Sequence, residues 1–412
     1  MPEFLTLLPP DEARELLLSN LSQQVTDSEI VEVPSALGRV LAEDIHATHP
    51  LPEFPRSTVD GFAVRARDTH GASESLPGYF KLVDEVPMGN VPLFKVSQGQ
   101  CGLIHTGGMV PPGADAVVML EHTQFVQADE IEVLRPVAEG ENVILVGEDV
   151  TQGQLVQKKG SWLRPAEIGG LMALGITEVR VRHKVRVGLI STGDEVIEPG
   201  QSTKPGQVRD VNSYTLSALV ERSGGMAIRY GIVQDDLEAL KTIAARALLE
   251  CDIVVITAGS SASMRDMTAD AIRLLGMPGV LVHGINTRPG KPTILGVCQG
   301  KAVIGLPGNP VSALVNGYLF VTPVIEKLLG TLSRPMPTVL AQLSVNLPSQ
   351  AGREDWWPVK LLRSEQSNFM EAEPIFGKSN LIFTLAAADG LMRIHPDTTG
   401  VSAGELVEVL LM

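Results

Sequence analysis

Cysteine is scarce in this chain. Only three of its 412 residues are cysteines, Cys101, Cys251 and Cys298, and they lie far apart. Their odd number and wide spacing fit a reducing compartment and exclude a framework of disulfide bonds. Cys101 precedes His105 by four residues, but both belong to the strand-like run "CGLIHTGG". A single pair of this kind indicates core packing rather than a metal site.

An excess of positive charge is also lacking. Lysine and arginine total 33 residues against 48 aspartates and glutamates, which gives a net charge of −15. This balance argues against a nucleic-acid-binding surface, because such surfaces are usually basic. It leaves room for a small anionic substrate, since a local basic patch can exist in an acidic protein.

Long apolar runs are absent as well. No segment approaches the ~18 to 20 uninterrupted apolar residues of a membrane-spanning helix. The first residues, "MPEFLTLLPPDEARELLLSNL", contain no basic segment followed by an apolar one, so no secretory signal is predicted. We therefore expect a cytoplasmic protein with neither a membrane nor a nucleic acid as partner.

The first half of the chain changes from helical to β-like spacing and back. Helices are predicted at Pro10–Asn20, Pro34–Ile45 and Leu163–Ile176. Between them, short β-like runs broken by Gly and Pro predict strands. A chain of this length exceeds a single core, since domains average ~150 residues. We predict a discontinuous helical linker domain, residues 1–48 and 141–183, around a β-rich insertion domain, residues 49–140.

The second half alternates strands and helices before turning β-rich. Strands are predicted at Val185–Thr192 and Asp252–Gly259, and helices at Ser213–Gly225 and Asp236–Glu250. Such alternation predicts a doubly wound parallel sheet with helices on both faces, here residues 184–332. Short strands with regular turns then predict a C-terminal β-barrel domain, residues 333–412. The predicted fold class is multidomain α/β.

Polar residues and glycines gather where the predicted strands of the doubly wound domain end. Ligands bind such sheets beyond the carboxyl ends of the strands, so these turns predict a site on one rim. Within them, Asn309 is placed to cap a helix with Pro310 as its first residue, and Asn212 or Ser213 to cap another. The turns are "STGDEV", "RDVNS", "QDD", "TAGSSASMRD", "RPGKP" and "LPGNPVS".

The residue types on this rim indicate a chemistry. The small residues of "GSSAS", ahead of a helix, form a potential anion-binding nest. Arg288 and Lys291 add charge that suits a phosphate. The carboxylates of Asp194, Glu195, Asp235 and Asp266 could ligate Mg²⁺ together with phosphate oxygens. Neither a Walker motif nor a GxGxxG motif is present. The residues predict a metal-assisted reaction on a phosphate-bearing small molecule.

The chain resembles the molybdopterin molybdenumtransferases of the MoeA/gephyrin family along essentially its whole length. Several specific motifs occur in the family's order. They are "STVDGFAV" (57–64), "IHTGGMVPPGADAVV" (104–118), "GEDV" (147–150), "STGDE" (191–195), "RPGKP" (288–292) and "LPGNPVSA" (306–313).

The resemblance implies an enzyme of molybdenum cofactor biosynthesis. Its expected reaction is the Mg²⁺-dependent insertion of molybdate into adenylylated molybdopterin with release of AMP. It implies a molybdopterin-binding doubly wound domain and a homodimer. Each active site would lie between the pterin domain of one subunit and the β-rich part of the other. The upstream adenylyltransferase is a candidate partner. The choice between molybdate and tungstate stays open.

The resemblance also assigns site residues. The implied catalytic residues are Asp60, Asp149, Glu195, Asp235 and Asp266, of which Glu195, Asp235 and Asp266 would also bind the metal. The implied substrate-binding residues are Ser57, Thr106, Thr192, Gly259, Ser260, Ser261, Arg288, Lys291, Pro307, Asn309 and Pro310.

The chain departs from the family pattern at three places. The glycine-rich loop reads "AGSSASMRD", the arginines before "GED" are replaced by Ile144, Leu145 and Val146, and Arg288 stands where lysine is usual. The first two changes favour an alternative, a non-catalytic scaffold or pterin carrier. Retention of the five carboxylates favours the enzyme. A third reading, an adenylyltransferase acting one step earlier, leaves the β-rich insertion and the barrel unexplained.

Overall fold

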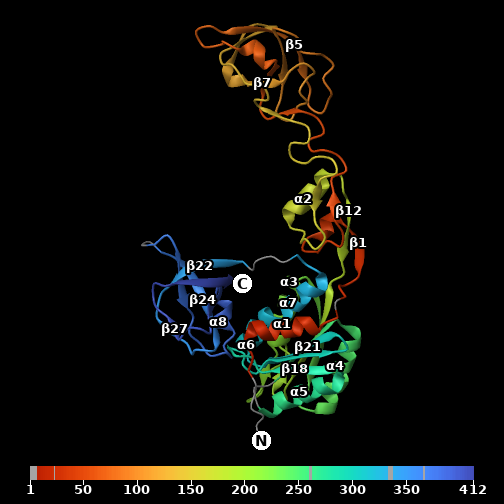
Figure 1. Ribbon diagram of the computed structural model, residues 1–412, viewed down its shortest axis with the longest axis vertical. Coiled ribbons are helices and arrows are strands. Elements are labelled where there is room, and N and C mark those ends of the chain that lie inside the picture. Colours follow the sequence, from red (N-terminus) through yellow and green to blue (C-terminus); the bar gives the residue numbers. More distant parts are fainter. Residues whose placement is uncertain (1–6, 23, 259–261, 333–336, 365–366) are drawn as a thin grey trace. The chain divides into compact units, whose positions relative to one another are not determined.

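The computed structural model describes residues 7–22, 24–258, 262–332, 337–364 and 367–412. The chain forms two compact units. The first contains residues 1–42, 159–164 and 178–412, and the second contains residues 43–158 and 165–177. Figure 1 labels the principal elements of both.

The first unit is built on a six-stranded sheet with the order β16-β13-β17-β21-β20-β18. Four neighbouring strands are parallel, and β20 is antiparallel to both of its neighbours. The strands are β13 (Val185–Thr192), β16 (Gly225–Val233), β17 (Ile253–Ala258), β18 (Pro278–His283), β20 (Ile294–Cys298) and β21 (Lys301–Pro307). The predicted parallel sheet is therefore present in four strands, and this edge adds antiparallel pairs that were not predicted. The reason is the Gln299–Gly300 turn, where both residues have positive φ, which makes β20 and β21 a tight hairpin.

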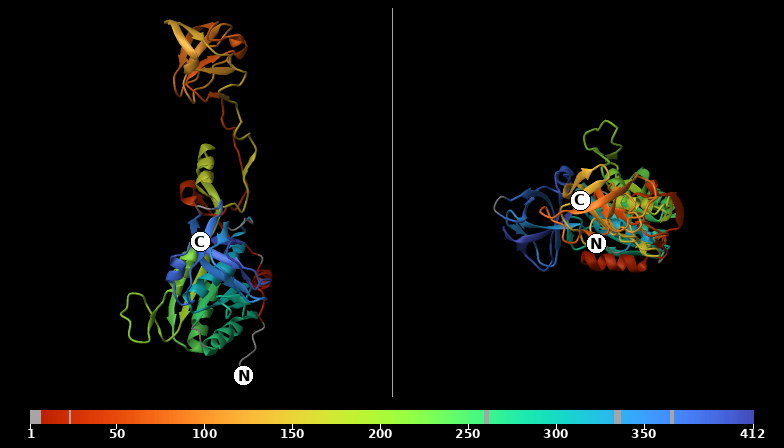
Figure 2. Two further views of the ribbon diagram at one scale, coloured as in Figure 1. Left: turned by 90° about the vertical axis from the view of Figure 1, so that its left-hand side faces the viewer. Right: turned by 90° about the horizontal axis from the view of Figure 1, so that it is seen from above.

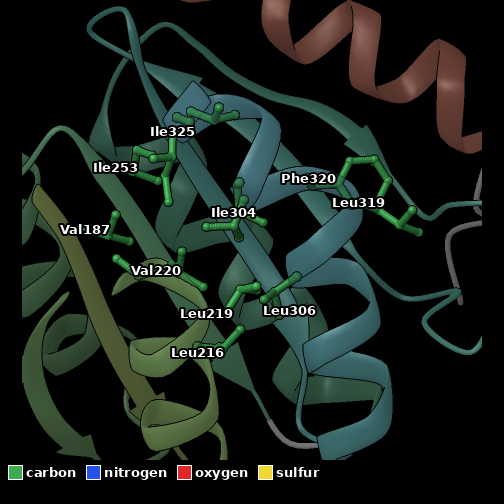
Figure 3. Close-up of a cluster of buried hydrophobic side chains, with 14 of the residues drawn as sticks. Val187, Leu216, Leu219, Val220, Ile253, Ile304, Leu306, Leu319, Phe320 and Ile325 are labelled. Carbon is green, nitrogen blue, oxygen red and sulfur yellow. The ribbon is translucent and has the colours of Figure 1, made fainter. Parts of the chain in front are cut away.

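Helices cover both faces of this sheet, as predicted. One core cluster joins the sheet to α1, α3, α6 and α7, and the other joins it to α4 and α5. Figure 3 shows part of the first, where Val187, Ile253 and Ile304 of the strands meet side chains of the covering helices. The helices are α1 (Pro10–Asn20), α3 (Asn212–Arg222), α4 (Leu237–Glu250), α5 (Ala262–Leu275), α6 (Pro310–Asn316) and α7 (Thr322–Leu329).

Of the two helices predicted near the N-terminus, one is present and one is not. The helix at Pro10–Asn20 is confirmed, and its Ala13 and Leu17 are buried in the first core cluster together with strand residues of the sheet. The prediction of a helix at Pro34–Ile45 is wrong. Only a short 3₁₀ turn, η1 (Val33–Ala36), forms there, because Gly38 with φ of +71° turns the chain away. Beyond it, Leu41 forms a bridge to Val181 of the ribbon made by β1 (Ser28–Glu32) and β12 (Glu178–Arg182), and Val40 forms a bridge to Trp162.

One helical run in the described part of the chain, Pro310–Leu329, is long and apolar enough to cross a membrane by length and composition alone. It comprises α6, a π-helical turn η4 (Gly317–Val321) and α7. Val315, Phe320 and Ile325 of this run are at most 1% exposed and belong to the core of the sheet. Its apolar composition is therefore that of a core helix.

The predicted C-terminal barrel is present. Five strands in the cyclic order β24-β25-β22-β28-β26 close because β26 also pairs with β24. The strands are β22 (Thr338–Leu343), β24 (Glu354–Arg363), β25 (Met370–Pro374), β26 (Gly390–Ile394) and β28 (Leu406–Leu411), with β23 (Leu347–Pro348), β27 (Gly400–Val401) and helix α8 (Phe383–Ala386) beside them. Strand β19 (Thr287–Arg288), which follows β18 in the chain, adds to β24 in parallel register.

The second unit carries a sheet of six strands in the order β7-β4-β6-β5-β9-β8 around Phe62, Phe80 and Ile131. Helix α2 (Pro165–Ala173) confirms the predicted return to helical spacing. The strands of this unit are β2 (Ile45–His46), β3 (Arg56–Ser57), β4 (Gly61–Val64), β5 (Gly78–Val86), β6 (Gln100–Ile104), β7 (Ala116–Met119), β8 (Thr123–Gln127), β9 (Glu130–Val133), β10 (Val143–Ile144) and β11 (Leu155–Gln157).

The multidomain α/β class is thus confirmed, while the four domain boundaries stay a prediction. One further feature of the first unit is an excursion between β13 and α3, which includes the short pair β14 (Val196–Ile197) and β15 (Val208–Arg209). Figure 2 shows this excursion in yellow-green, projecting from the sheet.

Candidate functional site

The carboxyl ends of three neighbouring parallel strands form the predicted rim. Strand β13 ends at Thr192, β17 at Ala258 and β21 at Pro307, and Ala258 is in register with Pro307. The hydroxyl of Thr192 donates to the carbonyl of Thr257 at 3.2 Å. Thr192 and Pro307 therefore lie on one edge of the sheet. Gly259, Ser260 and Ser261 follow β17 and lie outside the described residues.

A buried carboxylate, that of Asp210, forms hydrogen bonds with residues next to this rim. Asp210 accepts hydrogen bonds from the hydroxyls of Ser191 at 2.8 Å and Ser213 at 2.6 Å, and from the Ser213 amide at 3.1 Å. The expectation that Asn212 or Ser213 caps α3 is wrong, because the helix begins at Asn212 and Asp210 satisfies its early amide. Asn212 instead donates to the carbonyl of Gly308 at 2.8 Å, which ties α3 to the "PGNP" corner.

The "PGNP" corner has the predicted backbone. Asn309 occupies the N-cap position with extended backbone, and Pro310 is the first residue of α6. The Asn309 side chain makes no capping bond and donates to the hydroxyl of Ser379 at 3.1 Å. The amide group of Val311 donates to the carbonyl of Ser379 at 3.0 Å. The corner is therefore bonded to the segment after β25.

The turn Arg288–Lys291, called the cation turn below, is fixed by its own glycine. Gly290 has a φ of +110°, and its carbonyl accepts from the hydroxyl of Thr293 at 2.8 Å. Fully buried Asn316 of α6 donates to the carbonyl of Pro289 at 3.2 Å and to that of Ser312 at 2.8 Å. A Cβ atom on Gly290 would lie 1.7 Å from the Asn316 amide nitrogen. Only glycine fits this position.

Gly290→Ala is therefore expected to disturb both the turn and Asn316. The positive φ and the displaced amide should together lower the free energy of unfolding by about 2–4 kcal/mol. Denaturant unfolding measures this. Gly352→Ala is the matched control, because Gly352 also has positive φ, at +82°, but has no atom within 4 Å of the added Cβ. An equal loss in both variants would show that φ alone, and not Asn316, restricts Gly290.

A cavity of about 750 Å³ opens beside the cation turn and the "PGNP" corner. Four cationic side chains line it, Arg288 and Lys291 from the cation turn and Arg353 and Lys378 from the barrel. Within the described part of the chain, the ammonium groups of Lys291 and Lys378 have no hydrogen-bond or ion-pair partner. Burial among apolar barrel residues leaves Trp356 8% exposed, and Trp357 is half-buried. Both tryptophans line the cavity. The barrel contribution was missed by sequence reasoning.

Three predicted carboxylates gather at another part of the rim. The Asp235 amide donates to Asp194 Oδ1 at 3.2 Å. Burial, together with the charges of Asp194 and Glu195, raises the pKa of Asp235 above its usual value. None of these three lines the cavity described above. No set of three His, Cys, Asp or Glu side chains in metal-ligand arrangement occurs among the described residues.

Asp266 does not occupy the N-cap position of a helix. Helix α5 begins at Ala262, so Asp266 is a helical residue one turn inside, and it is exposed. The predicted turn "TAGSSASMRD" is therefore shorter than expected, because its last five residues are helical. No hydrogen bond or ion pair joins Asp266 to Asp194, Glu195 or Asp235 in the described part of the chain. The predicted metal trio therefore stays a prediction.

The second unit brings Asp60 and Thr106 together. Asp60 Oδ1 accepts from the Thr106 amide at 2.9 Å and from its hydroxyl at 3.3 Å, and His105 Nδ1 lies 3.5 Å away. These bonds, that of the backbone amide foremost, lower the pKa of Asp60. His105 also lies 3.0 Å from Glu85 Oε1. The Asp60 carboxylate is therefore ionised and exposed at neutral pH.

Core packing was predicted for both Cys101 and His105, and only Cys101 is buried. Cys101 is fully buried, and burial raises the pKa of its thiol to about 12. His105 is 41% exposed at the side chain, because β6 ends at Ile104 and the chain turns outward. His105 and Glu85 therefore join Asp60 on the surface and were missed by sequence reasoning.

Ser57 and Asp149 occupy different positions in the second unit. Ser57 is buried, and its hydroxyl donates to the carbonyl of Val59 at 2.6 Å. Strand pairing places Val143 opposite Ser57 and Ile144 opposite Arg56. Asp149 is exposed, and its amide donates to the carbonyl of Leu51 at 3.0 Å. No hydrogen bond or ion pair joins the Asp149 and Asp60 side chains among the described contacts.

Three family profiles cover nearly the whole chain in sequence order. Residues 8–175 match the MoeA N-terminal region (domain I and II). Residues 188–327 match a probable molybdopterin binding domain, and residues 341–412 match the MoeA C-terminal region (domain IV). The motifs on the rim and in the second unit fall within the first two profiles.

Individual relatives agree over full length. A putative molybdopterin biosynthesis protein of Methanocaldococcus jannaschii is 38% identical over 98% of each chain. A molybdopterin molybdenumtransferase of a Nostoc species is 34% identical over 94% of this chain and 89% of its own. The crystal structure of a molybdopterin biosynthesis MoeA protein from Pyrococcus horikoshii is 37% identical, covers 99% of this chain and all of its own, and superposes with a TM-score of 0.84. The chain belongs to the MoeA family of molybdopterin molybdenumtransferases, which serves molybdenum cofactor biosynthesis.

Proposed function

We propose that this chain inserts molybdate into adenylylated molybdopterin and releases AMP, with Mg²⁺ as the required ion. The observation that supports this most is the cavity lined by Arg288, Lys291, Arg353 and Lys378 in a protein of net charge −15. A concentration of cations in an acidic protein favours an anionic ligand, because a cleft lined by one sign of charge concentrates molecules of the opposite sign. Both substrates are anions, because one carries a phosphoanhydride and the other is an oxyanion.

The chain's cations would let two anions approach each other. The ammonium groups of Lys291 and Lys378, which have no partner among the described residues, can each donate three hydrogen bonds to phosphate or oxyanion oxygens. The guanidinium of Arg288 adds a planar donor set that suits phosphate. Held in one cavity, these groups would offset the repulsion between molybdate and the phosphate chain. Pro307 and Asn309, which also line the cavity, would shape its floor.

The carboxylates at the rim are of the chemical type that binds Mg²⁺. Asp194 and Glu195 repel the Asp235 carboxylate and contribute to the raised pKa of that group, and a divalent cation would relieve this repulsion. We assign Glu195 and Asp235, with Asp266 from α5, as the residues that would hold the ion. When bound, Mg²⁺ neutralises phosphate charge and polarises the phosphoanhydride. The carboxylates themselves would orient the ion against the substrate phosphate.

The second unit would complete the site in a homodimer. Its exposed Asp60, with Thr106 and His105 bonded to it, forms a polar group on the surface of the second unit. We propose that this group, with Ser57 and Asp149 of the same unit, serves the active site of the partner subunit. The assembly is proposed to be cytoplasmic and to accept its substrate from the upstream adenylyltransferase.

The homodimer gives a direct prediction. Light scattering coupled to gel filtration at micromolar concentration should give a mass of about twice the 44.0 kDa of the chain. A monomer mass together with intact activity would show that each chain carries a complete site and would remove Asp60 from the partner's chemistry.

One assay separates this function from its alternatives. The purified chain is incubated with adenylylated molybdopterin, molybdate and Mg²⁺, and AMP is quantified by liquid chromatography. The proposal expects AMP release that needs all three components. Substrate binding without AMP release would favour a pterin-binding scaffold. Formation of adenylylated molybdopterin from ATP and molybdopterin would identify an adenylyltransferase instead.

A further inference from the structure

A buried carboxylate lies where the barrel meets the cation turn. Asp355 is the second residue of β24 and is 0% exposed. Strand β19, which carries Arg288, pairs with β24 so that Arg288 stands opposite Asp355. The "EDWW" segment thus touches the cation turn through backbone pairing as well as through side chains.

Asp355 contacts both arginines of the cavity. Its Oδ1 accepts from Arg353 Nε at 2.7 Å, and its Oδ2 accepts from Arg353 Nη2 at 3.0 Å. Arg288 Nη1 lies 3.8 Å from the same Oδ2, and Ser349 donates to it at 3.0 Å. The two-point contact fixes the plane of the Arg353 guanidinium, since a fork of two parallel bonds allows one orientation.

Arg288 is held on a second side by an aromatic ring. Its guanidinium carbon lies 5.2 Å from the centre of the Trp357 ring. The Arg288 side chain is otherwise 54% exposed and would sample many rotamers. The ring and the carboxylate together restrict it to the cavity wall. Arg288 comes from the cation turn and Arg353 from the segment before β24, and the Asp355 carboxylate contacts both.

We propose that Asp355 is a positioning residue that holds Arg288 and Arg353 in the orientation in which they receive the anionic substrate. The inference rests on the proposed function. It assigns Asp355 no contact with substrate. The Asp355 carboxylate lowers the net positive charge beside the cavity, which by itself would weaken the binding of an anion. The proposal explains its presence, because the same carboxylate fixes the orientation of the Arg288 and Arg353 guanidinium groups.

The direction in which Asp355→Asn changes KM tests the proposal. Asp355→Asn removes a negative charge beside the cavity, so charge alone predicts tighter binding of an anion. Positioning predicts weaker binding, because asparagine cannot accept the fork from Arg353 with both oxygens. We expect KM for adenylylated molybdopterin to rise about tenfold, with kcat changed less than about twofold, as for a loss of uniform binding. The readout is AMP release under Mg²⁺ and molybdate saturation.

The preceding residue supplies the matched control. Glu354 is also a buried carboxylate on β24, 2% exposed, and it accepts from Arg393 Nε at 2.9 Å and from Trp356 Nε1 at 2.7 Å, a bond that the remaining oxygen of glutamine can still accept. Its side chain does not line the cavity. Glu354→Gln should lower Tm by a similar amount and leave KM unchanged. If Asp355→Asn does not fold, Ser349→Ala removes a single hydrogen bond to the same carboxylate and should raise KM about two- to threefold.

A double variant shows through which group Asp355 acts. In an Arg288→Ala background, Asp355→Asn should raise KM by a clearly smaller factor than the tenfold expected in the native chain, because the two residues are coupled. A native chain that releases AMP, with an Asp355→Asn variant whose KM is unchanged or lower, overturns the positioning role. A native chain that releases no AMP overturns the proposed function instead.

Discussion

Asp266→Asn is expected to slow AMP release by about 100-fold or more at saturating substrate, since charge stabilisation by a bound metal contributes several kcal/mol. The reason is the loss of one negative charge from the residues assigned to Mg²⁺. Asparagine keeps the size of the side chain and its oxygen, so only the charge changes. Higher Mg²⁺ should restore part of the rate. Stopped reactions analysed for AMP over a range of Mg²⁺ concentrations measure this.

The position of Asp266 in the structure separates a role in metal binding from a role in helix stability. Because α5 begins at Ala262, Asp266 does not cap the helix, and its exposed side chain has no packing role that would lower stability. Tm should therefore stay within about 2 °C. Asp270→Asn is the control, since Asp270 is exposed on the same helix and pairs with Arg273 at 2.8 Å. A normal, Mg²⁺-dependent rate in the Asp266 variant would remove this residue from the site.

Arg288→Ala is expected to raise KM for adenylylated molybdopterin roughly 10- to 100-fold, because a hydrogen bond to a charged group contributes about 1.5–3 kcal/mol. Arg288 would grip phosphate in the ground state and the transition state alike, so kcat should change little. Initial rates of AMP release over a range of substrate concentrations separate the two constants.

The control for Arg288 removes a guanidinium elsewhere in the same unit. Arg246 on α4 is exposed, pairs with Glu250 at 3.0 Å and does not line the cavity. Arg246→Ala should leave both constants unchanged. A fall in kcat at constant KM in Arg288→Ala would mean that the guanidinium acts on the transition state, which contradicts the proposed ground-state role.

Most helices and strands were predicted from the sequence because residues close together in the chain determine them. The strand Val185–Thr192 matches its prediction at both ends, since a β-branched apolar run is followed by a Gly-Asp turn. The antiparallel β20 was missed because its pairing depends on the positive φ of Gln299, which a single sequence does not reveal. The helix expected at Pro34–Ile45 does not form, because Gly38 turns the chain and Val40 and Leu41 bridge to Trp162 and Val181, which are distant in the sequence.

The candidate site was predictable only where its residues adjoin in the chain. Turns such as the cation turn carry their own signal in Pro and Gly. Arg353 and Lys378 carry none, because they reach the cavity only through closure of the barrel and the pairing of β19 with β24. The same holds for Glu85, which meets His105 across the parallel pair β5 and β6. Non-local strand pairing therefore accounts for most of what the sequence left out.

The most direct test of metal transfer is its stoichiometry. After a single turnover with adenylylated molybdopterin, molybdate and Mg²⁺, the released AMP is quantified and the cofactor is isolated from the protein for molybdenum analysis. The account predicts one dithiolene-bound molybdenum for each AMP released. AMP release that proceeds equally without molybdate, or that leaves the cofactor free of metal, would show a hydrolase rather than a transferase and would contradict the account.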